Sequence, residues 1–317
     1  HEAMPWPEAA RPSSRQMLAC AQFSRYADPR LAGHGALPQG GQPWLPLSEL
    51  LQTMLESGRL QLPWLEPTGF SDLRFAAPLP LPEAVTRECR ITARSQSWLL
   101  QDGVMTRMCH VRLQSRDLAP NLRRINHFSP LARGMVFLAA AAGSLPPLWD
   151  GEMAVTGPDL PLEDFYAGCG MAEGWRLLEE LAPAGDDLWQ GRFDGMAQGI
   201  APAGKSGYCS LLSAVDAILQ AACRIMEETV PRAELAGGRL LWPQGWRLSG
   251  IGFIRFADTG LLCGARMPWR IQLRRGWDDE RLQRYDAQVV DADGRVLLTL
   301  HQMEFEKDVR PQEGAGA

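Results

Sequence analysis

The first half of the chain shows one helical pattern among several strand patterns. Residues 45–60 carry apolar side chains at helical spacing, with two residues suited to a first turn: Leu47, Leu50, Leu51 and Leu55, with Ser48 and Glu49. Strand patterns occupy residues 17–23, 71–76, 85–95, 96–100 and 104–113, and residues 101–103 are typical of a hairpin turn. The pattern predicts one helix and a meander of strands.

The second half repeats this layout after a Pro- and Gly-rich connection that fills much of residues 117–162. Residues 211–228 predict a long helix with one apolar stripe. Strands are expected at residues 175–181, 187–193, 247–256, 261–273, 285–290 and 295–305, with a turn at 291–294. No sequence repeat links the halves, so a duplication is inferred from layout alone. A helix wrapped by a curved antiparallel sheet is the hotdog arrangement, and two hotdogs can share a continuous sheet.

The composition is that of an ordinary globular protein. Hydrophobic residues make up 45% of the 317 residues and charged residues 22%, and the formal net charge is −5. No Lys/Arg block stands out, which disfavours a nucleic-acid groove or binding to an anionic membrane. No apolar run approaches the roughly 18 residues that a membrane span needs. We also expect no signal peptide, because the first residues are Pro-rich and include acids.

The cysteines are scattered, odd in number and without a CxxC pair: Cys20, Cys89, Cys109, Cys169, Cys209, Cys223 and Cys263. This pattern favours free thiols, mostly packed as small apolar groups, and it offers no spacing for a structural zinc site. Free thiols suit a reducing compartment, so we expect a cytoplasmic protein without disulfides.

One candidate for acid–base chemistry is His34, in a Gly- and Pro-rich segment just ahead of the first predicted helix. A lone histidine in such a segment is most often an exposed turn residue. The functional alternative is a general base, because the ordinary histidine pKa near 6.5 suits proton transfer around neutrality.

A second candidate is Asp216, an acid within the otherwise apolar helix of residues 211–228, with Gln220 one turn later on the same face. An isolated carboxyl on such a helix faces either solvent or an apolar cavity. In a cavity, loss of hydration raises its pKa, so the group can stay protonated and act as an acid. The spacing alone leaves both alternatives open.

The remaining candidates are weaker. His110 and His301 lie in strand patterns and are more often core or rim residues, and His127 lies in the connection. Asp291 and Asp293 belong to a turn that has too few ligands for a metal loop. A GxGxxG phosphate loop and a GxSxG hydrolase elbow are both missing from the sequence.

Around His34 the chain resembles the dehydratase family of polyketide synthases and animal-type fatty acid synthases. The family motif HxxxGxxxxP, preceded by an L-x-x-H approach, is similar to residues 31–43, where His34 and Pro43 stand at the motif's ends. Pro38 occupies the glycine position, and Gly40 and Gly41 are displaced from it by two or three residues.

The resemblance continues in order over roughly residues 17–307. The motif GYxYGPxF is echoed at residues 170–175 without its tyrosine and proline. The motif HPxLLDxxxQ resembles residues 211–220, which keep Asp216 and Gln220 and lack the HP pair. Residues 241–243 are similar to the family's Leu-Pro segment, and residues 285–305 to its closing hairpin.

The resemblance implies an α+β double hotdog, in which two helix-wrapped antiparallel sheets are joined in one chain. The expected division is an N-terminal lead at residues 1–16, in part a cloning remnant, an N-terminal hotdog at 17–116, a linker at 117–162, a C-terminal hotdog at 163–307 and a flexible tail at 308–317.

The resemblance also implies the chemistry. His34 would take the α-proton of a 3-hydroxyacyl thioester, while Asp216, with Gln220 orienting the hydroxyl, would assist its departure across a shared tunnel. Residues expected to line the tunnel or donate to the thioester oxygen are Gly40, Gly41, Pro43 and Gly174. No metal or redox cofactor is implied, because the phosphopantetheine arm of a partner acyl carrier protein delivers the substrate. Neighbouring synthase domains are the other expected partners, and the oligomeric state, a homodimer included, stays open.

Three alternatives stay open beside this dehydratase. Pro38 and the incomplete motifs motivate a non-catalytic domain kept for architecture or carrier docking. The same His34–Asp216 pair could serve a cyclase or a double-bond isomerase. A thioesterase on an unrelated hotdog would release a free acid.

Overall fold

The computed structural model describes residues 16–24, 31, 34, 44–76, 81, 85–101, 103–149, 153–193, 208–229, 246–258, 265 and 268–307. Among these residues, no helix has both the length and the apolar character needed to cross a membrane.

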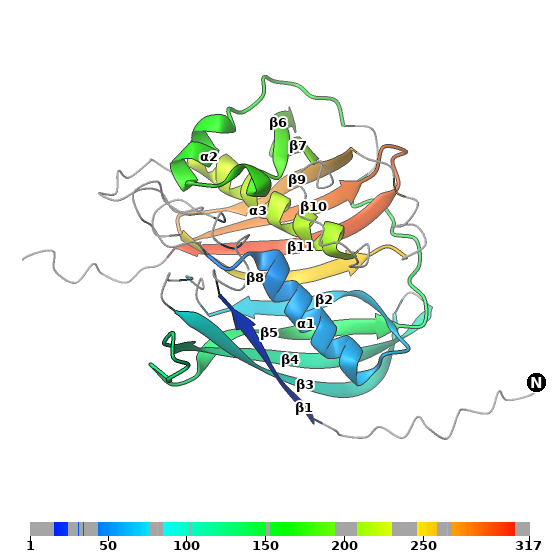
Figure 1. Cartoon of the computed structure of the whole chain (residues 1–317). Helices are drawn as coiled ribbons and strands as arrows, with labels where there is room; N and C mark the ends of the chain where they lie inside the picture. The colour runs from blue at the N-terminus through cyan, green and yellow to red at the C-terminus, as the bar shows by residue number, and fades with distance from the viewer. Residues whose placement is uncertain are drawn as a thin grey trace, which may run out of the picture.

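One antiparallel sheet of eleven strands runs through the described part of the chain (Figure 1). Its first five strands come from the N-terminal half, in the order β1-β3-β4-β5-β2, and the other six follow as β8-β11-β10-β9-β7-β6. The strands are β1 (Gln16–Phe23), β2 (Glu66–Phe75), β3 (Thr86–Gln101), β4 (Val104–Leu118), β5 (Ser129–Ala139), β6 (Leu178–Gly185), β7 (Leu188–Phe193), β8 (Trp246–Phe256), β9 (Trp269–Asp278), β10 (Leu282–Val290) and β11 (Val296–Lys307).

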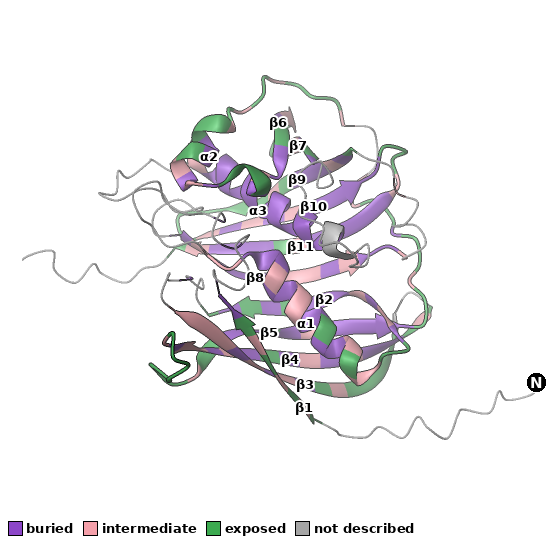
Figure 2. Ribbon diagram, viewed as in Figure 1, coloured by how far each residue is buried: buried purple, intermediate pink, exposed green. Residues whose placement is uncertain are grey.

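Two long helices lie on one face of this sheet, α1 (Leu47–Gln61) on the first half and α3 (Tyr208–Thr229) on the second (Figure 1). The apolar stripe expected for α1 is buried, and Gly58 brings that helix close to β5, because a Cβ there would lie 3.1 Å from Val136. Helix α3 is buried on every side from residue 211 to 226 (Figure 2). Each half is therefore a helix packed on its own antiparallel strands, as the sequence layout predicts.

The halves join where β2 pairs with β8. Gly69 of β2 lies opposite Arg255 and has a φ of +154°, and a Cβ there would meet the carbonyl oxygen of Ile254 at 2.0 Å. Only glycine allows the two backbones to approach so closely in this conformation. The predicted continuous sheet is thus confirmed, and one glycine permits its central contact.

The prediction of a connection over residues 117–162 was wrong for residues 129–139, which form strand β5. Strand β4 extends to Leu118, and β5 lies between β4 and β2 in the first half-sheet. This strand includes Pro130 and Gly134, two residues that are more common in loops. The strand packs tightly at Gly134, because a Cβ there would lie 2.7 Å from the end of the Leu73 side chain and 3.2 Å from the Ser71 carbonyl oxygen.

Smaller differences concern element bounds. The runs at residues 85–95 and 96–100 form one strand, β3, with a register shift between Ser95 and Trp98. The strand expected from residue 175 begins at Leu178, because Glu173–Trp175 form a 3-10 turn. Strand β9 begins at Trp269 within the run expected at residues 261–273. The short helix α2 (Glu163–Cys169) was not predicted.

The thiol prediction is confirmed for the cysteines whose side chains are described. All five are free, and all but the exposed Cys20 are buried: Cys89, Cys109, Cys169 and Cys223. The side chains of Cys209 and Cys263 lie outside the described residues.

We expect Gly69→Ala to lower the free energy of unfolding by about 1–3 kcal/mol more than Gly103→Ala, because only the first substitution forces two strands apart. Gly103 is the matched control, since its φ is also positive, at +77°, while a Cβ there would meet nothing within 4 Å. Urea unfolding of both variants measures the difference. Equal losses would show that the seam between the half-sheets tolerates a side chain.

Candidate active site

His34 is buried between residues from both halves of the chain. Only 4% of the residue is exposed, so the alternative of an exposed turn histidine is wrong. Its backbone carbonyl accepts a hydrogen bond from Trp44 N–H at 3.0 Å, and its ring Nδ1 lies 2.9 Å from the Trp44 carbonyl oxygen. From the second half, the ring of Trp175 packs edge-on against the imidazole at a centroid distance of 4.8 Å.

These contacts fix the proton on the His34 ring. A carbonyl oxygen only accepts hydrogen bonds, so Nδ1 carries the hydrogen and Nε2 carries the lone pair. Burial, partly offset by the Trp44 hydrogen bond, lowers the pKa of His34 from 6.5 to about 4. The imidazole is therefore neutral at physiological pH, with Nε2 in the form that accepts a proton.

Asp216 is buried at the middle of α3 and binds the start of α1. Its Oδ1 accepts a hydrogen bond from Leu47 N–H at 3.0 Å and its Oδ2 one from Ser48 N–H at 3.2 Å. The residue preceding α1 is Pro46, which provides no side-chain cap. A carboxyl from the second half therefore caps the central helix of the first.

Two opposing effects act on the Asp216 carboxyl. Burial disfavours the charged form, while the hydrogen bonds from Ser48 and Leu47 favour it, and burial is the larger effect. The pKa of Asp216 rises from 3.8 to about 7. Near neutral pH much of this carboxyl is protonated, which is the state that an acid catalyst requires.

Gln220 lies one turn after Asp216 and is held on three sides. Its Nε2 donates to the Trp175 carbonyl at 2.9 Å. Its Oε1 accepts from the Tyr166 hydroxyl at 3.0 Å and from Leu177 N–H at 3.2 Å. Gln220 therefore positions the segment that carries Trp175, and through Trp175 the ring of His34.

Three of the buried polar residues of α3 form a ridge at a spacing of one turn: Asp216, Gln220 and Arg224. Arg224 donates from Nε to the Pro161 carbonyl at 3.1 Å and pairs with Glu228 at 2.5 Å. The ridge thus binds α1, the segment around Trp175 and the residues before α2 in succession. Each of the three side chains thus has at least one polar partner, as buried polar side chains usually do.

Four contacts and two short chain segments link six residues of the two halves in a closed path, which we call the contact ring: His34, Trp44, Leu47, Asp216, Gln220 and Trp175. Trp44 precedes Leu47 by three residues, and Asp216 precedes Gln220 by one helical turn, so every step in the ring is short. The ring brings His34 and Asp216, 182 positions apart in sequence, into one buried region. It supports the predicted pairing of these two side chains.

Of the other residues expected at the site, only Gly174 is among the described residues. Gly174 lies in the 3-10 turn beside Trp175. Pro38, Gly40, Gly41 and Pro43 lie outside the described residues, so their predicted role at the thioester oxygen stays a prediction.

Three site residues were missed by sequence reasoning: Trp44, Trp175 and Tyr166. Trp175 falls within the echoed motif at residues 170–175, which is a signal that could have identified it. Tyr166 lies on the unpredicted helix α2. Its hydroxyl binds Gln220 and the backbone of Leu178, and burial raises the pKa of this hydroxyl.

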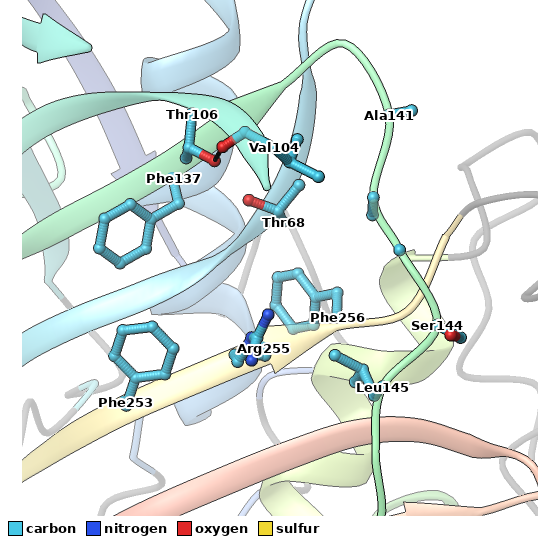
Figure 3. A pocket seen from close by; sticks show the side chains of 12 residues that line it. Thr68, Val104, Thr106, Phe137, Ala141, Ser144, Leu145, Phe253, Arg255 and Phe256 are labelled. Carbon is cyan, nitrogen blue, oxygen red and sulfur yellow. Dashed lines mark hydrogen bonds between the residues drawn. The ribbon is translucent and has the colours of Figure 1, made fainter. Parts of the chain in front are cut away.

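A cavity of about 260 Å³ lies elsewhere, on the sheet face opposite the helices (Figure 3). Its lining includes Thr68, Phe137, Phe253 and Arg255. Phe137 points to this outer face, because its neighbours Val136 and Leu138 belong to the core. This cavity is therefore separate from the buried region around His34.

The fold is that of polyketide synthase dehydratase domains. The chain superimposes on an N-terminal dehydratase from the difficidin assembly line with a TM-score of 0.63 and 11% identity, covering 93% of this chain and 94% of that one. For the dehydratase domain from the CurH module of curacin polyketide synthase, the values are 0.61 and 14%, with 92% of each chain covered. The bifunctional dehydratase-cyclase domain in ambruticin biosynthesis superimposes with a TM-score of 0.59 and 15% identity, covering 92% of this chain and 90% of that one. No family model and no curated protein sequence matches the chain.

These likenesses confirm the double hotdog expected from the sequence. The α+β class holds in its coarse sense, since a few helices cover one face of a single antiparallel sheet. At sequence identities of 11–15%, these likenesses show the fold alone, so the activity depends on the geometry of the site.

We expect Asp216→Ala to lower the free energy of unfolding by about 1–3 kcal/mol, because two amides at the start of α1 lose their buried acceptor. Asp216→Asn should cost less, since its carbonyl oxygen can still accept one of them. The exposed Asp159→Asn is the control. An Asp216→Ala variant as stable as the parent would contradict the capping role.

The capping carboxyl should also make stability pH-dependent. The folded-state pKa of Asp216, about 7, lies above its ordinary 3.8, so the folded protein binds the extra proton between these values. The stability contributed by this proton is complete below about pH 4 and is lost as the pH rises through about 7. The stability of the parent relative to Asp216→Asn should therefore fall between pH 4 and 8, as thermal unfolding across this range measures. A constant difference would show that the carboxyl does not titrate there.

Proposed function

We propose that the chain is a dehydratase, which eliminates water from a 3-hydroxyacyl thioester carried by an acyl carrier protein during polyketide or fatty acid chain assembly. The observation that supports this proposal is the contact ring, which links a buried imidazole of lowered pKa in one half to a buried carboxyl of raised pKa in the other. A base and an acid held in opposite protonation states are what a concerted elimination requires.

In the proposed reaction, Nε2 of His34 takes the proton from the α-carbon of the thioester. The electrons of that C–H bond form the new double bond, and the bond from the β-carbon to the hydroxyl oxygen breaks. Asp216 gives its proton to the departing hydroxyl, which leaves as water. A proton then returns from His34 to Asp216, directly or through solvent, and restores both groups.

The low pKa of His34 has a cost as well as a use. It keeps the ring neutral, but it also makes Nε2 a weaker base. The α-proton must therefore be acidified by a hydrogen bond to the thioester oxygen, which gains charge as the proton leaves. The first amides of α1 already donate to Asp216, and Pro38 has no N–H, so we assign this donor to the segment of Gly40 and Gly41.

The reaction needs no metal or redox cofactor, since both proton transfers are made by side chains. The phosphopantetheine arm and neighbouring synthase domains would belong to the partners, and we place the reaction in the cytoplasm.

The capping role of Asp216 supports a second candidate, a domain kept for architecture or carrier docking. In that case the carboxyl would be retained to hold α1, and turnover would be absent. A third candidate follows from the fold, because one structural neighbour is a bifunctional dehydratase-cyclase. Product analysis separates these activities, since dehydration loses one water while cyclisation and isomerisation conserve the mass of their direct substrates.

The decisive test is turnover of a 3-hydroxyacyl group loaded on a carrier protein, followed by mass spectrometry. His34→Gln, which can still donate to the Trp44 carbonyl, and Asp216→Asn should each lower kcat/KM by about 100-fold or more. His301→Gln, a substitution at the partly exposed histidine of β11, is the control. Unchanged turnover in either site variant would refute the assignment, and a parent without any dehydrated product would favour the architectural candidate.

The pH dependence of turnover should follow the same two groups. Catalysis requires His34 deprotonated, above its pKa of about 4, and Asp216 protonated, below its pKa of about 7. We expect kcat/KM to be highest between these values and to fall about tenfold per pH unit well above pH 7. A profile that rises from pH 7 to 9 would exclude Asp216 as the acid.

A further inference from the structure

The outer face of the first half-sheet carries a row of arginines that sequence composition does not reveal. Arg112 of β4 lies directly opposite Arg133 of β5, and Arg133 lies directly opposite Arg74 of β2. All three are exposed, on the face turned away from α1, because Val111 and Leu113 on either side of Arg112 are buried in the core. We call these three residues the arginine row.

This arrangement opposes the stability of the sheet. Like charges directly opposite on neighbouring strands repel each other. Arg74 is compensated by Glu304 at 2.8 Å. Arg112 and Arg133, by contrast, have neither an ion pair nor a side-chain hydrogen bond with any described residue, and the same is true of Arg94 beside them on β3. The positive charges of Arg112 and Arg133 also act on the adjacent His110. Burial lowers the pKa of this histidine, and the two arginines lower it further.

We propose that the arginine row is a docking surface for an acidic helix of a partner protein. The guanidinium groups of Arg112 and Arg133 are exposed and have no acidic partner among the described residues, so they are open to the carboxylates of a second protein. Neighbouring strands are about 4.8 Å apart, so the row presents its cations at that interval along about 10 Å. Carboxylates at positions i and i+4 of a helix are about 5–6 Å apart. A helix laid across the strands can therefore place one carboxylate near Arg112 and the next near Arg133.

The surroundings of the row favour a narrow ligand. On one side Arg74 and Arg284 share Glu304, and on the other Arg116 pairs with Glu88. These ion pairs confine the free positive charge to a short strip. A membrane surface or a nucleic-acid backbone spreads its charge over a wider area and would meet Glu304 and Glu88 as well. A helix with acids along one face avoids both.

This proposal is independent of the reaction at His34, because the row lies on the opposite side of the sheet from α1 and α3. Substitutions in the row should leave dehydration of a small soluble thioester unchanged. A failure of the docking surface and a failure of the proposed reaction are therefore distinguishable.

The test uses the whole chain and a fluorescent helical peptide with glutamates at every fourth position, measured by anisotropy. Arg112→Gln and Arg133→Gln should each weaken binding by about two- to fivefold, the range of exposed ion pairs. Arg281→Gln removes an exposed arginine outside the row and should leave binding unchanged. Binding should also weaken as salt is raised.

A second measurement separates docking from a structural role. Because Arg133 lies between two like charges, Arg133→Gln should raise the Tm or leave it unchanged, whereas a structural arginine would lower the Tm when replaced. The proposal is overturned if Arg133→Gln lowers the Tm, or if the row variants bind the peptide as the parent does. It is also overturned if a glutamine version of the peptide, vesicles of anionic lipid or duplex DNA bind as tightly as the acidic peptide.

Discussion

The two halves of this protein depend on one buried contact, the carboxyl of Asp216 at the first amides of α1. Helix α1 begins after a proline that offers no cap, and its free N–H groups are deep enough to need a partner inside the fold. The partner comes from the centre of α3, in the other half. Sheet pairing between β2 and β8 joins the halves along their edges, whereas this contact joins their central helices.

The same contact explains how an acid can be buried and still be usable. A carboxyl in an apolar interior without partners would be too costly as an anion and would lack orientation as a neutral acid. Hydrogen bonds from Leu47 and Ser48 recover part of that cost, while burial keeps the pKa near neutrality. A single interaction thus orients the group, holds its proton within reach of physiological pH and ties it to the segment that leads back to His34.

The sequence allowed much of the fold to be predicted, for physical reasons that particular elements show. The periodicity of α1 is clear because its apolar stripe from Leu47 to Leu55 is buried, and α3 is rich in apolar residues because it is buried on every side from residue 211 to 226. Strand β5 escaped prediction because Pro130 and Gly134 are usual loop residues, and only the packing of β5 against Leu73 explains the glycine. The closeness of β2 and β8 at Gly69 is a long-range property that local patterns do not encode.

The sequence identified the two titratable residues of the candidate site but not the residues that contact them. His34 and Asp216 stood out as isolated titratable residues, but a histidine in a Gly-rich segment gives no local sign that it will be buried. The contacts that fix its tautomer come from Trp44 and from Trp175, whose significance depends on a fold that brings residues 34 and 175 together. Gln220 is expected to orient the substrate hydroxyl, and that role stays a prediction; in the structure its side chain binds the backbone of Trp175 and Leu177 and the Tyr166 hydroxyl.

The two faces of the sheet therefore differ in how their polar groups are placed. The helical face buries its polar groups, and each described member of the α3 ridge meets a specific partner in the fold. The outer face exposes Arg112 and Arg133 in a register where their charges repel. Burial without partners on the first face, or exposure without partners on the second, would each cost stability. No acidic group among the described residues relieves the repulsion between Arg112 and Arg133, and a partner protein with acidic side chains would relieve it.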